Sequence, residues 1–393
     1  MRIYSYYCDS SQILLVGNIM LKKLVLVFLS IIILFSPSPS INIIQNQNTW
    51  YFIALGDNRQ QLGSWDYNLN KYSHDNTTNP IRKALYESIV QNNPNLDFIV
   101  HTGDIVANGG EQDDWNRYKE DIAILDQNNV TIYYAPGNHE YYTYATGPGV
   151  YGTPDSNLST YLANVELPGN EMYYSFDVHN QIHFVFLNNN EYSGSLGMTT
   201  DQLDWLKHDL DTNALENIIV VYHRPSYSVR SHSRVLDAQE VRNSLESLFI
   251  SHGVDLVLAG HDHYYYRTVR NGITHIVTGG GGAELATNDD TSEWLDSDVF
   301  YSNYHYCNIS VLNDKLVVSA ISFNEVTNST AIIDSFEISF QKTFPSSTTS
   351  SSTGISTSLD TSTSLTADLN IMNFGIAIFM LLAIEKRRKR NLK

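Results

Sequence analysis

The chain has little cysteine and few basic residues. Its 393 residues include two cysteines, of which Cys8 lies near the N-terminus and Cys307 stands alone in the rest of the chain, so a disulfide framework is not expected. Lys and Arg total 24 against 42 Asp and Glu, which gives a formal net charge of −18. This balance argues against nucleic acid as a partner, because a phosphate backbone is bound by Lys and Arg that displace its counterions.

Long apolar runs are also lacking, since neither terminal hydrophobic segment reaches the roughly 20 residues of a typical membrane-spanning helix. Residues 24–35 are almost entirely apolar; two lysines precede them, and small residues and prolines follow. That order is typical of a secretory signal. We therefore expect a signal peptide over residues 20–40, with residues 1–19 as a candidate mis-annotated extension. The alternative is an N-terminal membrane anchor.

The C-terminal part of the sequence changes composition twice. Residues 342–368 consist largely of Ser and Thr and predict an exposed stalk without a core. Residues 369–393 join an apolar run to a basic cluster, which is typical of a membrane anchor that ends on the cytoplasmic side. The alternative is a basic amphipathic segment on a membrane surface. With the signal peptide, these segments predict a secreted protein anchored at the cell surface, whose C-terminal segment has the membrane as its partner.

Between these ends, residues 48–341 are expected to form one α/β domain. Hydrophobic residues make up 42% of the chain, enough for a substantial core. Strand-like and helix-like stretches alternate through the first two-thirds of this region, as in layered α/β folds. One helix is expected over residues 110–128. Three later strand-like stretches are expected to complete a second sheet, namely 304–311, 315–323 and 332–338.

Polar side chains follow the ends of successive apolar strands. A single Gly-Asp or a pair of histidines is common in ordinary turns, but in open α/β sheets ligands bind beyond the carboxyl ends of strands. A set of such residues after several strands therefore favours a shared site. Mixed oxygen and nitrogen donors suit Fe, Zn or Mn, and their number suits two ions about 3.5–4 Å apart. The candidate ligands are Asp57, Asp104, Asn138, His223, His261 and His263.

These residues carry a family resemblance over about residues 50–323. The chain resembles the calcineurin-like metallophosphoesterases in five ordered motifs: Gly56-Asp57, Gly103-Asp104, Gly137-Asn138-His139-Glu140, His223 and Gly260-His261-Asp262-His263. Residues 222–227 and 260–267 are similar to the purple acid phosphatase branch in particular. The resemblance implies a four-layer α/β/β/α sandwich.

The resemblance also implies a role for each motif residue. Asp104 would bridge two divalent or trivalent ions. The other ligands would divide between the two sites, with Asn138, His223 and His261 in one and Asp57 and His263 in the other. His139 would be catalytic, as general acid or as an orienting donor, and the substrate would contact Asn138, His139 and Arg224.

Two positions depart from the family pattern. Arg59 stands where metallophosphoesterases have a histidine, two residues after the first aspartate. Ala107 stands where purple acid phosphatases have a tyrosine, three residues after the second aspartate. The site of Asp57 therefore lacks one protein ligand under either pattern. We interpret Arg59 as a catalytic contact to a substrate phosphate, which its fork geometry suits; the alternative is a surface arginine.

The resulting hypothesis is a phosphoric ester hydrolase at the cell surface. A metal-activated hydroxide would attack small-molecule phosphomonoesters in line, without a covalent intermediate on the enzyme. The alternative enzyme is an extracellular phosphodiesterase or nucleotidase. An alternative from another class is a non-catalytic surface binding module with a degenerate metal site, which the residues at positions 59 and 107 motivate.

Overall fold

The computed structural model of the chain describes residues 49–60, 65–66, 71–72, 79–142, 154–190 and 197–340. The chain divides into two compact units, Met1–Phe344 and Pro345–Lys393, and all described residues belong to the first. The predicted signal peptide, stalk and C-terminal anchor lie outside the described residues. Within the described ranges, no helix combines the length and the apolar character that crossing a membrane requires.

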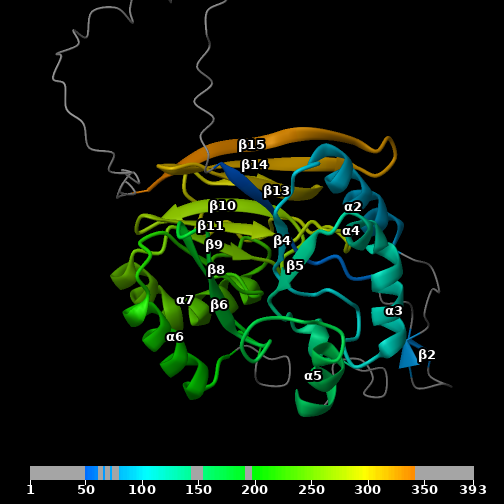
Figure 1. Ribbon diagram of the computed structural model, residues 1–393, viewed down its shortest axis with the longest axis horizontal. Coiled ribbons are helices and arrows are strands. Elements are labelled where there is room, and N and C mark those ends of the chain that lie inside the picture. Colours follow the sequence, from blue (N-terminus) through cyan, green and yellow to red (C-terminus); the bar gives the residue numbers. More distant parts are fainter. Residues whose placement is uncertain are drawn as a thin grey trace, which may run out of the picture. The chain divides into compact units, whose positions relative to one another are not determined.

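A six-stranded sheet combines strands from the beginning and the end of the described chain (Figure 1). Strand β1 (Trp50–Leu55) pairs in parallel with β4 (Phe98–His101), and β4 pairs in parallel with β5 (Thr131–Tyr134). On its other side β1 pairs antiparallel with β13, and the order continues to β14 and β15. The late strands are β13 (Tyr304–Val311), β14 (Lys315–Asn324) and β15 (Ser329–Ser339).

The expectation that these late strands complete the second sheet is therefore wrong. Val311 of β13 lies opposite Trp50 at the start of β1, so the chain returns to the sheet in which it began. Alternation of buried and exposed residues predicts that a stretch is a strand, but it does not say which sheet edge the strand joins.

A second sheet has seven strands in the order β12-β10-β11-β9-β8-β7-β6. Strands β7, β8, β9 and β11 are parallel neighbours, whereas β6, β10 and β12 pair antiparallel. The strands are β6 (Tyr174–Val178), β7 (Ile182–Phe186), β8 (Ile218–Val221), β9 (Leu256–Ala259), β10 (Tyr265–Arg270), β11 (Ile273–Thr278) and β12 (Val299–Tyr301). Two further short strands, β2 (Trp65–Asp66) and β3 (Lys71–Tyr72), pair only with each other among the described residues.

Two helix ends show clear capping chemistry. Asn79 caps α2 (Pro80–Asn92), because its side-chain oxygen accepts the N–H of Ile81 and of Arg82, both at 3.1 Å. Helix α7 (His232–His252) ends at Gly253, whose φ of 67° suits glycine. Further helices are α5 (Pro154–Leu162), α6 (Thr200–Thr212) and the short 3-10 helix η1 (His139–Tyr141).

The helix expected over residues 110–128 is divided into α3 (Gln112–Asp121) and α4 (Ala123–Gln127). Ile122 leaves helical geometry with φ −96° and ψ 5°. Its side chain is buried with those of Trp115 and Leu125, so the apolar face runs across the break. The periodicity of that face consequently could not reveal the division.

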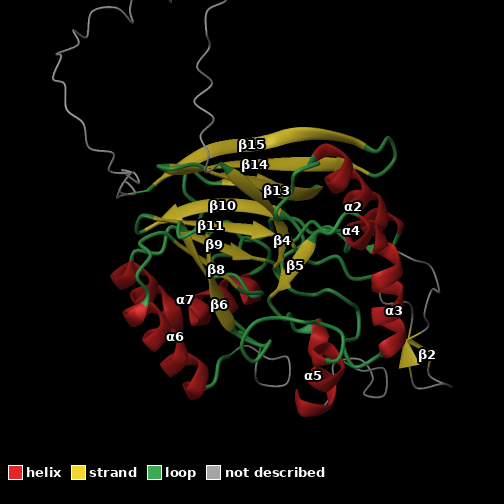
Figure 2. Ribbon diagram, viewed as in Figure 1, coloured by secondary structure: helices red, strands yellow, loops and turns green. Residues whose placement is uncertain are grey.

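Three apolar interfaces separate four layers, which confirms the α/β/β/α sandwich. Between the two sheets, Phe98 of β4 meets Phe184 of β7 with ring centroids 5.5 Å apart. Side chains of α2 and α3 pack on the outer face of the first sheet, and those of α6 and α7 on the outer face of the second. Figure 2 shows α2–α4 on one side of the paired sheets and α6 and α7 on the other.

Candidate metal centre

The strand ends of both sheets meet at one place. Asp57 follows β1 and Asp104 follows β4 in the first sheet, while His223 follows β8 and the pair His261 and His263 follows β9 in the second. Because β1 is parallel to β4 and β8 is parallel to β9, their carboxyl ends lie at the same edge of each sheet. The side chains of these residues are all buried.

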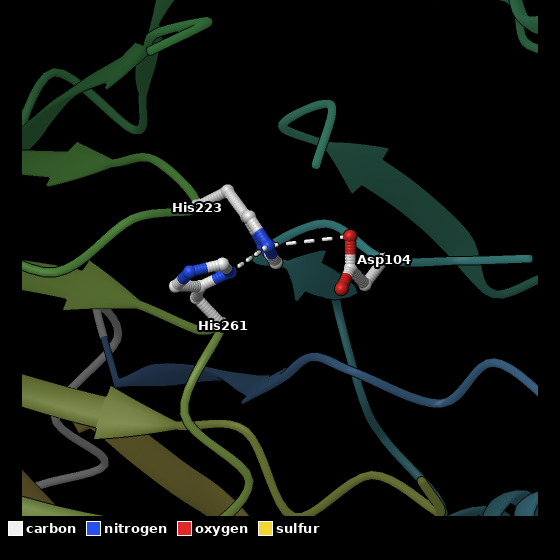
Figure 3. Close-up of side chains that lie close together, drawn as sticks. All are labelled: Asp104, His223 and His261. Carbon is white, nitrogen blue, oxygen red and sulfur yellow. Dashed lines mark hydrogen bonds and ion pairs between the residues drawn. The ribbon is translucent and has the colours of Figure 1, made fainter. Parts of the chain in front are cut away.

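One cluster consists of Asp104, His223 and His261, whose ligand atoms all lie within 4.8 Å of one another. His223 Nε2 is 3.2 Å from Asp104 Oδ1, and His261 Nδ1 is 3.1 Å from His223 Nε2. Figure 3 shows the two imidazoles and the carboxylate turned toward one another. Asn138 adds an oxygen to this cluster, since its Oδ1 lies 3.2 Å from His223 Nε2 while its Nδ2 donates to the Tyr142 hydroxyl at 2.8 Å.

A second cluster consists of Asp57, Asp104 and His263, with the same 4.8 Å limit between ligand atoms. His263 Nε2 lies 3.5 Å from Asp57 Oδ1. Asp104 belongs to both clusters, so its carboxylate is the group placed to bridge two ions. Asn138, His223 and His261 thus lie together beside Asp104, and Asp57 and His263 form the smaller group.

The backbone at these ligands is held in an uncommon conformation. Asp57, Asp104 and His261 have φ values of 58°, 54° and 70°, in the left-handed region that non-glycine residues seldom occupy. The His261 N–H donates to both carboxylate oxygens of Asp57 at 2.9 Å, which ties the two strand ends together. At Gly260, a Cβ would lie 2.3 Å from Asp57 Oδ2, so glycine is required for this close approach. Strain that the surroundings enforce in this way is typical of functional sites.

The charges of the centre suit a cation. Burial, followed by the charge of Asp104, raises the pKa of Asp57 well above its ordinary value. Burial opposes ionisation of Asp104 too, but His223 and His139 bring the pKa of Asp104 well below its ordinary value overall. Burial lowers the pKa of His261, and it lowers that of His263 to about 3, so both imidazoles are neutral near pH 7. Buried carboxylates beside neutral imidazoles form a donor set that fits bound metal ions.

His139 lies beside this centre. Its backbone N–H donates to Asp104 Oδ1 at 3.0 Å, and its Nε2 is 3.8 Å from Asp104 Oδ2. Its Nδ1 donates to the carbonyl of Ala107 at 2.7 Å, so Nε2 is the ring nitrogen that faces the carboxylate. The carbonyl of Ala107 therefore orients the imidazole.

Both predicted arginines are at the centre. Arg59 Nε lies 4.0 Å from Asp104 Oδ2, so this side chain is not a remote surface group. Arg224 Nη1 lies 3.3 Å from His261 Nε2, and its Nε donates to Asn190 Oδ1 at 2.7 Å. The structure thus places every predicted site residue in one region.

Sequence reasoning missed the groups that orient the ligands. The Nδ1 of His223 donates to the carbonyl of Thr102 at 2.8 Å, and that of His263 donates to the carbonyl of Glu284 at 2.6 Å. These contacts fix which ring nitrogen faces the two candidate ligand clusters. Every residue has a backbone carbonyl, so the sequence does not show which carbonyls accept hydrogen bonds from these histidines. Asn189 and Asn190, which hold Arg224, could have been noticed as polar residues directly after the apolar stretch 182–187.

Comparison with known proteins identifies similar sequences. Residues 48–265 match the sequence model of a family described as Calcineurin-like phosphoesterase. The chain is 30% identical over 188 residues to Purple acid phosphatase 15 of Arabidopsis thaliana, which covers 43% of this chain and 32% of that protein. It is 27% identical over 271 residues to Acid phosphatase type 7 of Danio rerio, covering 56% of each. The chain thus spans about a third to just over half of the length of these relatives.

A solved structure shares the fold. Purple acid phosphatase PPD1 from yellow lupin (Lupinus luteus) seeds aligns with a TM-score of 0.56 at 20% identity, over 74% of this chain and 54% of that one. At this identity the similarity is one of fold, and it agrees with the layered architecture described above.

Proposed function

Since the chain belongs to the calcineurin-like phosphoesterase family, we propose that it hydrolyses phosphate esters with the help of two metal ions. The observation that carries the proposal is that two buried ligand clusters share Asp104. Small-molecule phosphomonoesters are the proposed substrates, because the curated relatives compared above are named as acid phosphatases.

The two clusters would hold one ion each, of Fe, Zn or Mn. Asp104, Asn138, His223 and His261 would bind one ion, and Asp57, Asp104 and His263 the other. A pair of ions at such a site lowers the pKa of water and neutralises negative charge on the phosphate oxygens. The set around Asp57 has fewer protein donors, because position 59 is arginine and position 107 is alanine. Without a tyrosinate ligand, the protein should also lack the charge-transfer colour of purple acid phosphatases.

His139 would move the proton of the leaving group. The Nδ1 contact with the Ala107 carbonyl leaves Nε2 as the ring atom that meets the substrate, and Nε2 acts as general acid or as an orienting donor when the imidazole carries its second proton. Arg224 would bind a phosphate oxygen beside the cluster of His223, held in place by Asn190. Arg59 would do the same beside Asp57 and Asp104.

The proposal is tested by measuring bound metal together with the hydrolysis of 4-nitrophenyl phosphate and of bis(4-nitrophenyl) phosphate. We expect two ions per chain, turnover of the monoester, and a loss of about 100-fold or more in kcat for His261→Ala, because it removes a ligand. Turnover of the diester alone would establish the phosphodiesterase alternative. If neither ester is turned over, the binding-module alternative takes the place of the hydrolase. Wild-type turnover in His261→Ala would instead show that hydrolysis does not depend on the proposed metal site.

We also propose that the protein is secreted and held at the cell surface by its C-terminal segment. The support is the order of lysines, apolar residues and small residues near the N-terminus, and the apolar run with a basic end over residues 369–393. Expression with and without residues 369–393 tests this proposal. We expect the full chain in the membrane fraction and the shortened chain in the medium; recovery of both in the cytosol would contradict it.

A further inference from the structure

A cavity of about 370 Å³ adjoins the cluster of Asp57 and His263. Arg59, Arg230 and His263 all line it, so its wall contains two guanidinium groups and one candidate metal ligand. Because His263 belongs both to the cavity and to the cluster, a molecule bound at the cluster can extend directly into the cavity. The volume lies at the lower end of the roughly 300–1,000 Å³ of small-molecule sites, which suits a short extension.

The two arginines retain capacity to bind an anion. Arg59 Nε is buried and has no hydrogen-bond partner among the described residues, although the side chain as a whole is 16% exposed. Its Nη1 reaches the carbonyl of Gln60 only at 3.4 Å. Arg230 Nη1 lies 3.7 Å from Asp262 Oδ1, an ion pair that is longer than a hydrogen bond. Neither guanidinium is therefore saturated by these neighbours.

Asp262 explains why Arg230 lies at this cavity. Its Oδ2 accepts the hydroxyls of Ser228 and Tyr264 at 2.5 and 2.9 Å, while its buried Oδ1 has no hydrogen-bond partner in the described part of the chain. Oδ1 faces Arg230 at 3.7 Å and Arg234 at 3.9 Å. One buried carboxylate thus attracts two arginines, and of these two only Arg230 lines the cavity.

We propose that Arg230, next to Arg59, binds a second anionic group of the substrate, while Arg59 contacts the reacting phosphate. The preferred esters would carry a carboxylate or another phosphate a few bonds from the reacting phosphate, an inference that rests on the proposed function. Guanidinium groups concentrated beside the centre of a chain with net charge −18 give this region a local attraction for anions. The acidic residues of the wall, Glu284 and Asp289, are exposed, so solvent screens their repulsion.

The experiment compares ligands that differ only in the second charge. Phosphoglycolate and ethyl phosphate serve as substrates, and the non-hydrolysable 3-phosphonopropionate and propylphosphonate serve in calorimetric binding. We expect the carboxylate-bearing member of each pair to be favoured about tenfold, in kcat/KM and in Kd respectively. Ethanediol bisphosphate extends the comparison to a second phosphate and should be favoured to a similar degree.

Matched variants assign this preference to the cavity. Arg230→Gln should reduce both ratios to about one, whereas Arg234→Gln should retain them, because Arg234 faces the same Asp262 oxygen without lining the cavity. Equal binding of the two phosphonates to the wild-type protein would overturn the inference, and so would loss of the preference in both variants. Hydrolysis of both esters without preference would contradict this inference but not the proposed function. Tighter binding of 3-phosphonopropionate without hydrolysis of either ester would support the anion site but contradict the proposed function.

Discussion

Glu140 Oε2 accepts the backbone N–H of Asp104 at 3.0 Å, and thereby holds the residue that belongs to both ligand clusters. The same carboxylate accepts the N–H groups of Ile105, Val106 and Gly137. Gly137 precedes Asn138, so one buried side chain fixes the loops after β4 and β5. Burial, followed by the charge of Asp104, raises the pKa of Glu140 to about 8, whereas the backbone N–H groups of Gly137, Val106 and Ile105 favour the carboxylate and lower it.

The first prediction concerns Glu140→Gln. The amide places an N–H₂ group where an oxygen accepts backbone N–H donors, so the free energy of unfolding should fall by about 3 kcal/mol. Urea denaturation measures this loss. Glu337→Gln is the control, because Glu337 pairs with Lys315 at the surface and should change stability by less than about 0.5 kcal/mol. Equal stability of the two variants would show that Glu140 does not support the loops.

The second prediction is a pH dependence of stability at His183, which lies on β7. Burial alone would lower the pKa of His183, but hydrogen bonds with Asp209 at 2.9 Å and Asp177 at 2.7 Å raise it above 6.5. A group whose folded pKa is raised stabilises the protein fully below its unfolded pKa of about 6.5, and this stabilisation is lost as the pH rises through the folded pKa. His183→Gln should therefore lower the free energy of unfolding by about 1 kcal/mol more at about pH 5.5 than at about pH 9.

Denaturation curves at the two pH values measure this difference, and Asp209→Asn tests its cause. In the Asp209→Asn background the pH-dependent part should become smaller, because Asp177 is then the only one of the two carboxylates left to raise the pKa of His183. An identical cost of His183→Gln at both pH values would contradict the prediction.

The sequence predicted the polar residues at the strand ends better than it predicted the sheet that β13 joins or the backbone groups that contact those residues. A buried strand produces an apolar run, and the residue that follows it is visible as Asp, Asn or His, so Asp57, Asp104 and His261 could be identified. The sheet joined by β13 was not predictable from alternation, which is alike for any half-buried strand. Likewise, the carbonyls of Thr102 and Glu284 act through backbone atoms that every residue possesses. The role of Arg230 depends on a long-range approach to Asp262, which local patterns do not encode.

The third prediction separates the two histidines of the loop after β9. His261 shares its cluster with Asp104, His223 and the oxygen of Asn138, whereas His263 shares its cluster with two carboxylates only. His263→Ala should therefore retain one ion per chain, while His261→Ala should retain less metal than His263→Ala, because it removes an imidazole from the better supplied site. Elemental analysis of the purified proteins measures both, with the surface variant His252→Gln as control. Greater metal loss in His263→Ala would reverse the assignment.

The last prediction restores a ligand at position 59. Arg59 Nε lies 4.0 Å from Asp104 Oδ2, so an imidazole at this position would stand beside the cluster of Asp57, Asp104 and His263. Arg59→His should tighten the weaker-bound ion by about tenfold or more, because it adds a donor and removes a positive charge. Arg59→Gln is the matched control, since it removes the charge without supplying a nitrogen ligand. Equilibrium dialysis against Mn²⁺ or Zn²⁺ compares the two. If both variants gain affinity equally, the charge of Arg59 rather than the missing ligand limits metal binding, and if neither gains, position 59 does not belong to the metal site.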